Sequence, residues 1–366
     1  MRPAYLATLA LLLLAGCAHR TRTDSVAPAA AMPLTDGTRA VVVAERFVTA
    51  PILGEELDSL ATWTSPGGRP WLLASAKSSH RLIVLDAGNG RHLRTAGAPG
   101  SQPGEFRRPN GLAVSGDLLF VVERDNHRVQ MLRLPSLAPV AMFGQAELRS
   151  PYGIWLHRRT PGALDVYVTD SFMEGAHHDV VPPASALDRR VHRFHVDLDA
   201  ATPVARDGGS FGATEGEGML HMVESIAGDA AHDRLLVADE YRAGGSTLRD
   251  YHLDGRFAGR VVRGGTFGGE AEGVALWTCG DSGYWIAVDQ LAPLTRFHVL
   301  AREDLEPVGT FTGAVTAQTD GIALHASPTA TFPGGVLYAV HDDRAIAAFD
   351  LRDVVRALRL DPACAP

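Results

Sequence analysis

Lysine is almost missing from this chain of 366 residues, in which Lys77 is the only example beside a large set of arginines. Lysine offers a compact ammonium on a flexible stem, whereas arginine offers a planar fork. Lys77 is therefore either a remnant in an arginine-biased sequence or a position that needs an ammonium. A basic excess is missing too: the formal net charge of −8 argues against a nucleic-acid-binding protein, which needs a basic stripe.

Long hydrophobic runs are also scarce. The one such run, over residues 4–15, follows Arg2 and ends in Leu-Ala-Gly-Cys17. It is too short to span a bilayer as a mature helix. Its basic start and small-residue end predict a secretory signal peptide over residues 1–16.

The Leu-Ala-Gly-Cys ending resembles a bacterial lipobox. The resemblance implies cleavage before Cys17 and a lipid on its thiol, which would hold the protein to a membrane; an ordinary cleavage site beside a chance cysteine is the alternative. Ala18 follows the cysteine, which by the same resemblance favours the outer membrane. The composition of residues 17–40, rich in Ala, Thr and Pro, predicts a flexible tether. Residues 41–366 are expected to form the body of the protein.

Only two cysteines remain after the tether, Cys279 and Cys364. An exported compartment permits a disulfide between them, which would staple the C-terminal tail to the body. Two free thiols are the alternative, and the sequence leaves both open.

The body contains an internal repeat. Short Val- and Leu-rich runs are separated by turn residues, which favours many short strands. Six similar units align, each with a first strand, a second apolar strand with a polar end, and a third strand. The second strands begin at Trp71, Leu118, Asp165, Leu235, Tyr284 and Val336. The residues before the first strands are Asp58, Asn110, Tyr152, Glu224, Glu272 and Asp320, of which the last three are 48 residues apart.

A period near 50 residues with three or four strands in each unit predicts an all-β fold, a six-bladed β-propeller. A pair of β-sandwiches is the alternative, but it would not require polar residues at equal places in every unit. Unit three has an extra segment over residues 172–189, for which we expect a surface loop. A metal site at His177 and His178 of this segment is the other possibility.

The inner strands of a propeller line one channel, so equivalent residues converge around one axis. The residues before the first strands should form one ring. The residues that end the second strands should form another, of Lys77, Arg124, Asp170 or Ser171, Glu240, Gln290 and Asp342. One side of the mouth should then be acidic, and the other cationic with the Tyr152 phenol. The simpler interpretation is that polar residues end strands because turns follow them.

Gathered carboxylates repel one another unless a cation lies among them. All-oxygen ligands suit hard cations, Ca²⁺ above all where six to eight oxygens gather. Lys77, Arg124 and Tyr152 beside such a metal would suit phosphate. The sequence therefore predicts a calcium site next to a phosphate site.

Several motifs resemble the β-propeller phytases, calcium-dependent 3-phytase-like enzymes that hydrolyse phytate. They are Asp58-Ser-Leu-Ala-Thr-Trp63, Pro151-Tyr-Gly-Ile154, Glu270-Ala-Glu-Gly273, Thr319-Asp-Gly-Ile322 and Phe332-Pro-Gly-Gly335. The resemblance implies calcium ligands at Asp58, Glu224, Glu240, Glu270, Glu272, Gln290 and Asp320. It also implies catalytic phosphate contacts at Lys77, Arg124 and Tyr152, with metal-activated water as the nucleophile and a monomer as the working form.

This sequence departs from the family pattern at three positions. Ser59 replaces an aspartate, Glu270 is one carbon longer than the usual aspartate, and Ser171 stands where a second phosphate-binding lysine is expected. A calcium-dependent propeller lactonase or esterase, and a propeller that only binds, are therefore alternatives. Residues 100–130 resemble one repeat of the NHL propeller families, which indicates a blade and says little about chemistry.

Overall fold

The structure is a computed structural model that describes residues 40–68, 70–262 and 264–366. The expected signal peptide, the lipidated Cys17 and the tether up to residue 39 lie outside the described residues. No helix in the described part of the chain has the length and apolar character needed to cross a membrane.

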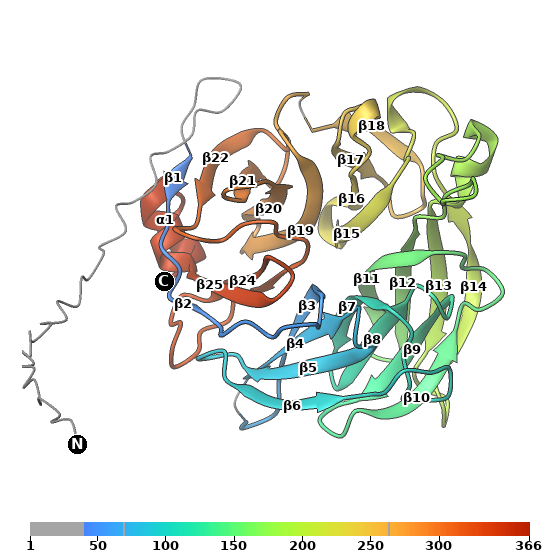
Figure 1. Cartoon of the computed structure of the whole chain (residues 1–366). Coiled ribbons are helices and arrows are strands. Elements are labelled where there is room, and N and C mark those ends of the chain that lie inside the picture. The colour runs from blue at the N-terminus through green and yellow to red at the C-terminus, as the bar shows by residue number, and fades with distance from the viewer. Residues whose placement is uncertain (1–39, 69, 263) are drawn as a thin grey trace, which may run out of the picture. The chain divides into compact units, whose positions relative to one another are not determined.

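Six antiparallel sheets stand around one axis, so the six-bladed β-propeller is confirmed (Figure 1). Blade one holds β3 (Leu57–Thr64), β4 (Pro70–Ala76), β5 (Arg81–Asp86) and β6 (His92–Ala96). Blade two holds β7 (Pro109–Ser115), β8 (Leu118–Glu123), β9 (Arg128–Arg133) and β10 (Ala138–Phe143). Blade three holds β11 (Pro151–Thr160), β12 (Ala163–Asp170), β13 (Val191–Asp197) and β14 (Val204–Phe211).

The remaining blades follow the same order. Blade four holds β15 (Val223–Asp229), β16 (Arg234–Asp239), β17 (Thr247–Tyr251) and β18 (Phe257–Val261). Blade five holds β19 (Glu270–Cys279), β20 (Ser282–Gln290), β21 (Arg296–Ala301) and β22 (Pro307–Thr312). Blade six holds β23 (Ile322–His325), β24 (Val336–His341) and β25 (Ala345–Asp350).

The chain closes the ring with its own first residues. Strand β2 (Phe47–Val48) pairs with β25 and becomes the outer strand of blade six, and β1 (Val41–Val42) pairs in parallel with β22. Figure 1 shows these two blue strands beside the red C-terminal elements. Blade six is therefore built from both ends of the propeller, and β2 covers the edge of β25 that would otherwise be open.

The hydrophobic core is divided among the blade interfaces. Each of the six clusters of buried apolar residues draws on two neighbouring blades. The second strands are buried on both faces; Leu72 and Leu73 of β4, for example, are both fully buried. This double burial explains why the second strands are continuous apolar runs rather than alternating ones.

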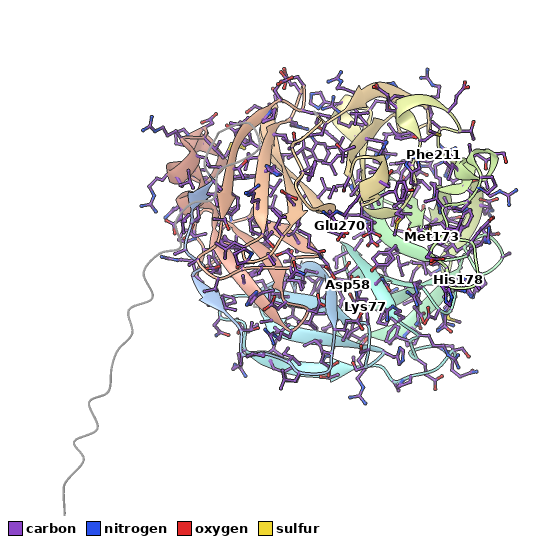
Figure 2. All side chains as sticks on the ribbon, turned by 45° about the horizontal axis from the view of Figure 1, so that its top comes forward. Asp58, Lys77, Met173, His178, Phe211 and Glu270 are labelled. Carbon is purple, nitrogen blue, oxygen red and sulfur yellow. A yellow bond between two sulfur atoms is a disulfide. The ribbon has the colours of Figure 1, made fainter. Side chains whose placement is uncertain are left out.

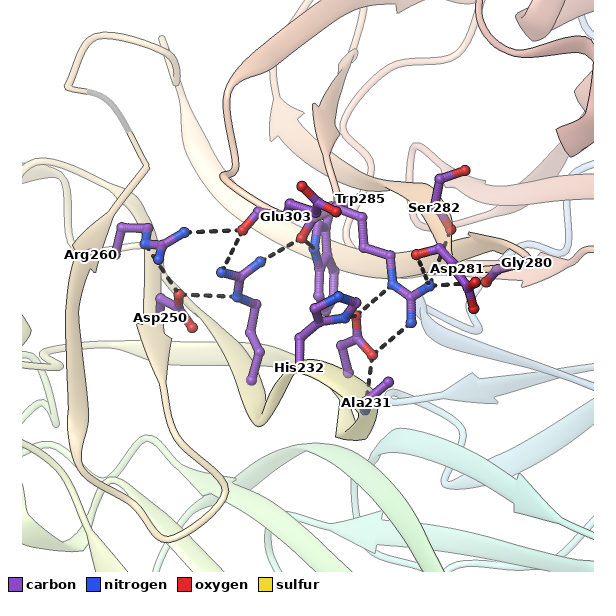
Figure 3. Close-up of polar contacts among 12 residues, drawn as sticks. Ala231, His232, Asp250, Arg260, Gly280, Asp281, Ser282, Trp285 and Glu303 are labelled. Carbon is purple, nitrogen blue, oxygen red and sulfur yellow. Dashed lines mark hydrogen bonds and ion pairs between the residues drawn. The ribbon is translucent and has the colours of Figure 1, made fainter.

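Buried ion pairs join blades four and five (Figure 3). Arg302, which follows β21, donates from Nε and Nη2 to the two carboxylate oxygens of Asp229 at 2.6 and 2.9 Å. Arg234 donates to Asp250 at 3.0 Å and to the Glu303 carbonyl at 2.8 Å. These contacts fix the register of one blade against the next.

The C-terminus lies on blade five. Helix α1 (Leu351–Leu358) is capped by Asp350, whose side chain accepts a hydrogen bond from the Arg352 N–H. A disulfide joins Cys279 at the end of β19 to Cys364, so the disulfide alternative is the one that the structure adopts.

The extra segment of blade three is a loop, as expected, with a short 3-10 helix over Ala184–Arg189. It is not wholly solvated, because Phe172 and Leu187 are buried. His178 is exposed, and no cluster of three metal-binding groups among the described residues includes His177 or His178.

Candidate functional site

A repeated irregularity turns one residue of each inner strand toward the channel. In five blades the pairing register of the first two strands shifts just after the strand begins. A bulge of this kind re-aims a side chain. The residues placed at the shift are Asp58, Asn110, Tyr152, Glu224 and Glu272, so the first predicted ring exists.

The residue after each ring position is small because neighbouring blades meet there. The N–H of Gly321 donates to the carbonyl oxygen of Asp58 at 3.0 Å, and a Cβ on Gly321 would lie 2.4 Å from that oxygen. Ser59 takes the equivalent place in blade one, where its N–H donates to the Ser75 hydroxyl. Ser59 is therefore part of the close packing between neighbouring inner strands, where small residues are required.

The second ring is identified by one hydrogen bond that recurs. The N–H groups of the residues after the second strands donate to the carbonyl two residues before the inner-ring residue. The pairs are Lys77 with Glu56, Arg124 with Arg108, Ser171 with Ser150, and Glu240 with Met222, at 2.9 to 3.1 Å. Ser171, rather than Asp170, is therefore the blade-three member of the ring.

In blades three, four and five, the aspartate that ends the second strand has a structural role. Asp170 accepts hydrogen bonds from the N–H groups of Arg149 and Ser150, and Asp239 accepts them from His221 and Met222. Asp289 does the same for Gly268 and Gly269 of blade five. These carboxylates hold the loops that lead into their blades and are not available to a ligand.

The carboxylates at the channel mouth form a tight group. One oxygen each of Glu240, Glu270 and Glu272 lies within 4.8 Å of the others. Gln290 donates from its amide nitrogen to Asp320. Asp58, Glu224 and Glu272 are all less than one-tenth exposed. These contacts bring predicted metal ligands together, and Figure 2 shows two of them, Asp58 and Glu270, near the centre of the propeller.

Crowding of like charges shifts the pKa values of this group. Burial and the repulsion of neighbouring carboxylates raise the pKa values of Glu224 and Glu272 well above the usual range. Burial, with repulsion from Asp58, raises the pKa of Asp320 to about 8. Burial raises the pKa of Glu240 to about 7. Burial and the nearness of other carboxylates thus both disfavour the charged forms of these side chains.

Lys77 lies among the carboxylates, not opposite them, so its expected place on a separate cationic side is wrong. Its ammonium is 3.1 Å from Asp58, 3.5 Å from Asp320 and 3.6 Å from Glu56. Burial alone would lower the pKa of Lys77, but attraction to Asp58 and Asp320 outweighs burial and raises it. The predicted sorting is wrong because Asp58 of the same blade lies beside Lys77, and the lysine stem also reaches Asp320 of blade six.

A cavity of about 550 Å³ opens beside the carboxylate group, over blades two to four. It includes four of the predicted site residues: Arg124, Tyr152, Glu224 and Glu240. It also contains His178, which the sequence offered only as a possible metal ligand, and residues that sequence reasoning did not select, namely His127, Arg149, Ser150, Phe172, Met173 and Met222. Figure 2 shows Met173 and His178 to one side of Asp58, Lys77 and Glu270.

Two predicted phosphate contacts shape this cavity. The Arg124 guanidinium is half-buried and donates from Nε to its neighbour Asp125 at 2.7 Å. Burial and the surrounding carboxylates raise the pKa of the Tyr152 phenol well above its usual range. Tyr152 therefore keeps its proton at neutral pH and can donate a hydrogen bond.

The residues of this group fit a hard cation. Every side chain predicted as a ligand offers oxygen, which matches the preference of Ca²⁺. The fully buried Asn110 lies in the same ring, and neither its amide nitrogen nor its amide oxygen has a hydrogen-bond partner. An unpaired buried amide costs free energy, so a bound group that satisfies it would stabilise the site.

Comparison with known proteins adds one family motif. Residues 106–131 match the NHL repeat, which covers β7, β8 and most of β9 in blade two. No curated protein matches the chain. Similar solved structures include hydrazine synthase of Kuenenia stuttgartiensis (14% identity, TM-score 0.45, 85% of this chain and 81% of that chain). Another is a nidogen/laminin complex (14% identity, TM-score 0.44, 72% and 82%).

Proposed function

We propose that this protein is a calcium-dependent phosphomonoesterase that hydrolyses phytate or a related phosphate ester with metal-activated water. The observation that carries the proposal is the 550 Å³ cavity, where Glu224 and Glu240 face the same space as Arg124 and Tyr152. Groups suited to a divalent cation and groups suited to a phosphate thus share one cavity. The motif resemblance to β-propeller phytases supports the same chemistry.

The chain's own residues divide the work. The ligands for calcium would be Asp58, Glu224, Glu240, Glu270, Glu272, Gln290 and Asp320. Bound calcium would neutralise phosphate oxygens and would lower the pKa of a coordinated water. Arg124 would hold the phosphate through its planar fork, and the protonated Tyr152 would donate a hydrogen bond to it. Lys77 would neutralise Asp58 and Asp320 and, through them, set the charge of the site.

Phosphate release tests the proposal. Purified protein in Ca²⁺ should release inorganic phosphate from phytate or simpler esters, and a chelator should abolish release. Arg124→Gln should lower kcat/KM by about tenfold to a hundredfold because a charge-assisted contact is lost. Arg206→Gln, an exposed arginine of the outer strand β14, is the matched control and should behave like the wild type.

The proposal fails if folded protein that gains thermal stability from Ca²⁺ releases no phosphate from any of these esters. The specific observation that favours a non-catalytic propeller scaffold is the ion pairing of Lys77 with Asp58 and Asp320, which already neutralises part of the acidic group. A scaffold of this kind need not gain stability from Ca²⁺, whereas an assembled calcium site should.

A further inference from the structure

The cavity beside the carboxylates has a second arginine in its wall. Arg149 lines it together with Arg124. Within the described part of the chain, the Arg149 guanidinium has no carboxylate at ion-pair distance, whereas Arg124 is paired with Asp125. The positive charge of Arg149 is therefore the less compensated of the two.

An aromatic ring holds Arg149 in place. Its guanidinium carbon lies 4.0 Å from the centre of the Phe172 ring, a geometry in which a cation is attracted to the ring face. Phe172 is itself fixed, because the Arg190 guanidinium lies 4.5 Å from the same ring centre. Arg190 is fully buried and donates to the carbonyl oxygens of Asp170 and Phe172.

The backbone of Arg149 is held by hydrogen bonds. Its N–H donates to Asp170 at 2.8 Å, and its carbonyl oxygen accepts a hydrogen bond from His127 Nδ1 at 2.5 Å. The exposed Arg149 side chain is thus anchored at its base and contacts the Phe172 ring at its guanidinium, which reduces the freedom that it loses on binding.

The rest of the cavity adds no further arginine or lysine for a second phosphate; its other basic groups are the imidazoles of His127 and His178. Met173 and Met222 add adaptable apolar surface, and Ser171 adds no charge. Glu224 and Glu240 in the same wall are proposed calcium ligands and offer a second phosphate no cationic side chain. A volume of about 550 Å³ is the size of a site for a small organic molecule.

We propose that this cavity selects a phosphate monoester with one phosphate and a compact apolar group. Arg149 binds the phosphate together with Arg124, and the apolar group lies against Met173 and Met222. Phe172 is a positioning residue that acts through Arg149. The inference rests on the proposed phosphomonoesterase function and names its substrate class, with phytate as the poorer substrate.

Steady-state kinetics of the calcium-loaded protein test the substrate class. The value of kcat/KM should be at least about tenfold higher for 1-naphthyl phosphate than for glycerol 2-phosphate or phytate, because an apolar group is buried. Arg149→Gln should raise KM about tenfold with a smaller change in kcat. Phe172→Leu should raise KM as well, and Phe172→Trp, which keeps an aromatic face, should restore it. Arg206→Gln is the control.

A binding measurement separates the two proposals. Calorimetry with the non-hydrolysable phenylphosphonate should show binding that Arg149→Gln weakens about tenfold. If phenylphosphonate binds in this way but no ester is hydrolysed, the phosphomonoesterase function is wrong and the cavity assignment stands. If esters are hydrolysed but Arg149→Gln keeps the wild-type KM, or phytate is preferred, the cavity assignment is wrong. Absence of both hydrolysis and binding overturns both.

Discussion

Lys77 is the residue on which the charge of the channel mouth depends. It is the only ammonium side chain in the protein, it is 6% exposed, and its partners Asp58, Asp320 and Glu56 come from two blades. A compact ammonium can be shared among several carboxylates in a confined space, whereas a planar guanidinium requires more room. This geometry explains why an arginine-biased sequence retains a lysine here.

Replacement of Lys77 by methionine should destabilise the protein in a chelator by roughly 3 kcal/mol, because it leaves buried carboxylates without their cation. Saturating Ca²⁺ should recover most of this loss, since a bound divalent cation would supply the missing positive charge. Urea unfolding with and without Ca²⁺ measures both effects.

Arg81→Met, at an exposed position of β5, is the control for a lost positive charge. Equal unfolding midpoints for Lys77→Met and this control in a chelator would contradict the role assigned to Lys77.

At the scale of elements, most strands follow from the sequence. The second strands begin within two residues of their expected places, because apolar runs bounded by turns are local features. The fourth strands were not predicted individually, since β6 and β18 carry polar and half-buried residues. Helix α1 was missed, although Leu351, Val354, Val355 and Leu358 have helical spacing.

The ion pair between Asp229, at the end of β15, and Arg302, which follows β21, gives a prediction at this scale. Asp229→Asn should lower stability by roughly 3 kcal/mol at pH 7, because it weakens the paired hydrogen bonds with the buried Arg302. Burial would raise the pKa of Asp229, but hydrogen bonds from Arg302 and His232 outweigh burial and lower it.

The sign of the pH dependence follows from this lowered pKa. A carboxylate with a lower pKa in the folded state stabilises the protein fully above its unfolded pKa and loses that contribution as the pH falls through the folded value. The difference in urea midpoint between wild type and Asp229→Asn should therefore shrink below about pH 4. Asp254→Asn, which breaks an exposed pair with Arg256, should not change the midpoint. A difference for Asp229→Asn that persists undiminished to pH 3 would refute this account.

At the scale of the whole molecule, ring closure and the disulfide act together. Strands β1 and β2 secure the beginning of the propeller on blades five and six, and Cys364 secures the end on β19. Opening the ring between blades six and one therefore requires that β2 detach from β25 and β1 from β22.

The disulfide closes a loop with a sequence separation of 85 residues. The variant Cys364→Ser should therefore lose roughly 2 to 4 kcal/mol of stability through the larger entropy of its unfolded chain. Thermal unfolding of wild type in reductant should approach that of the variant, and the variant should be insensitive to reductant. If the variant were as stable as the oxidised wild type, the disulfide would add nothing to the stability of the closed ring.

The amino-acid sequence by itself determined the six repeats, the propeller, and the positions that face one end of the channel, because these depend on local strand patterns and on a fixed period. Only the tertiary structure decided which ring members touch. It placed Lys77 among the carboxylates, committed the Asp170 carboxylate to the loop before β11, placed Ser171 in the ring, and brought Arg149 and Phe172 into the cavity wall. The physical reason is that these contacts join residues far apart in the sequence, and their distances depend on side-chain reach and packing that no local pattern records.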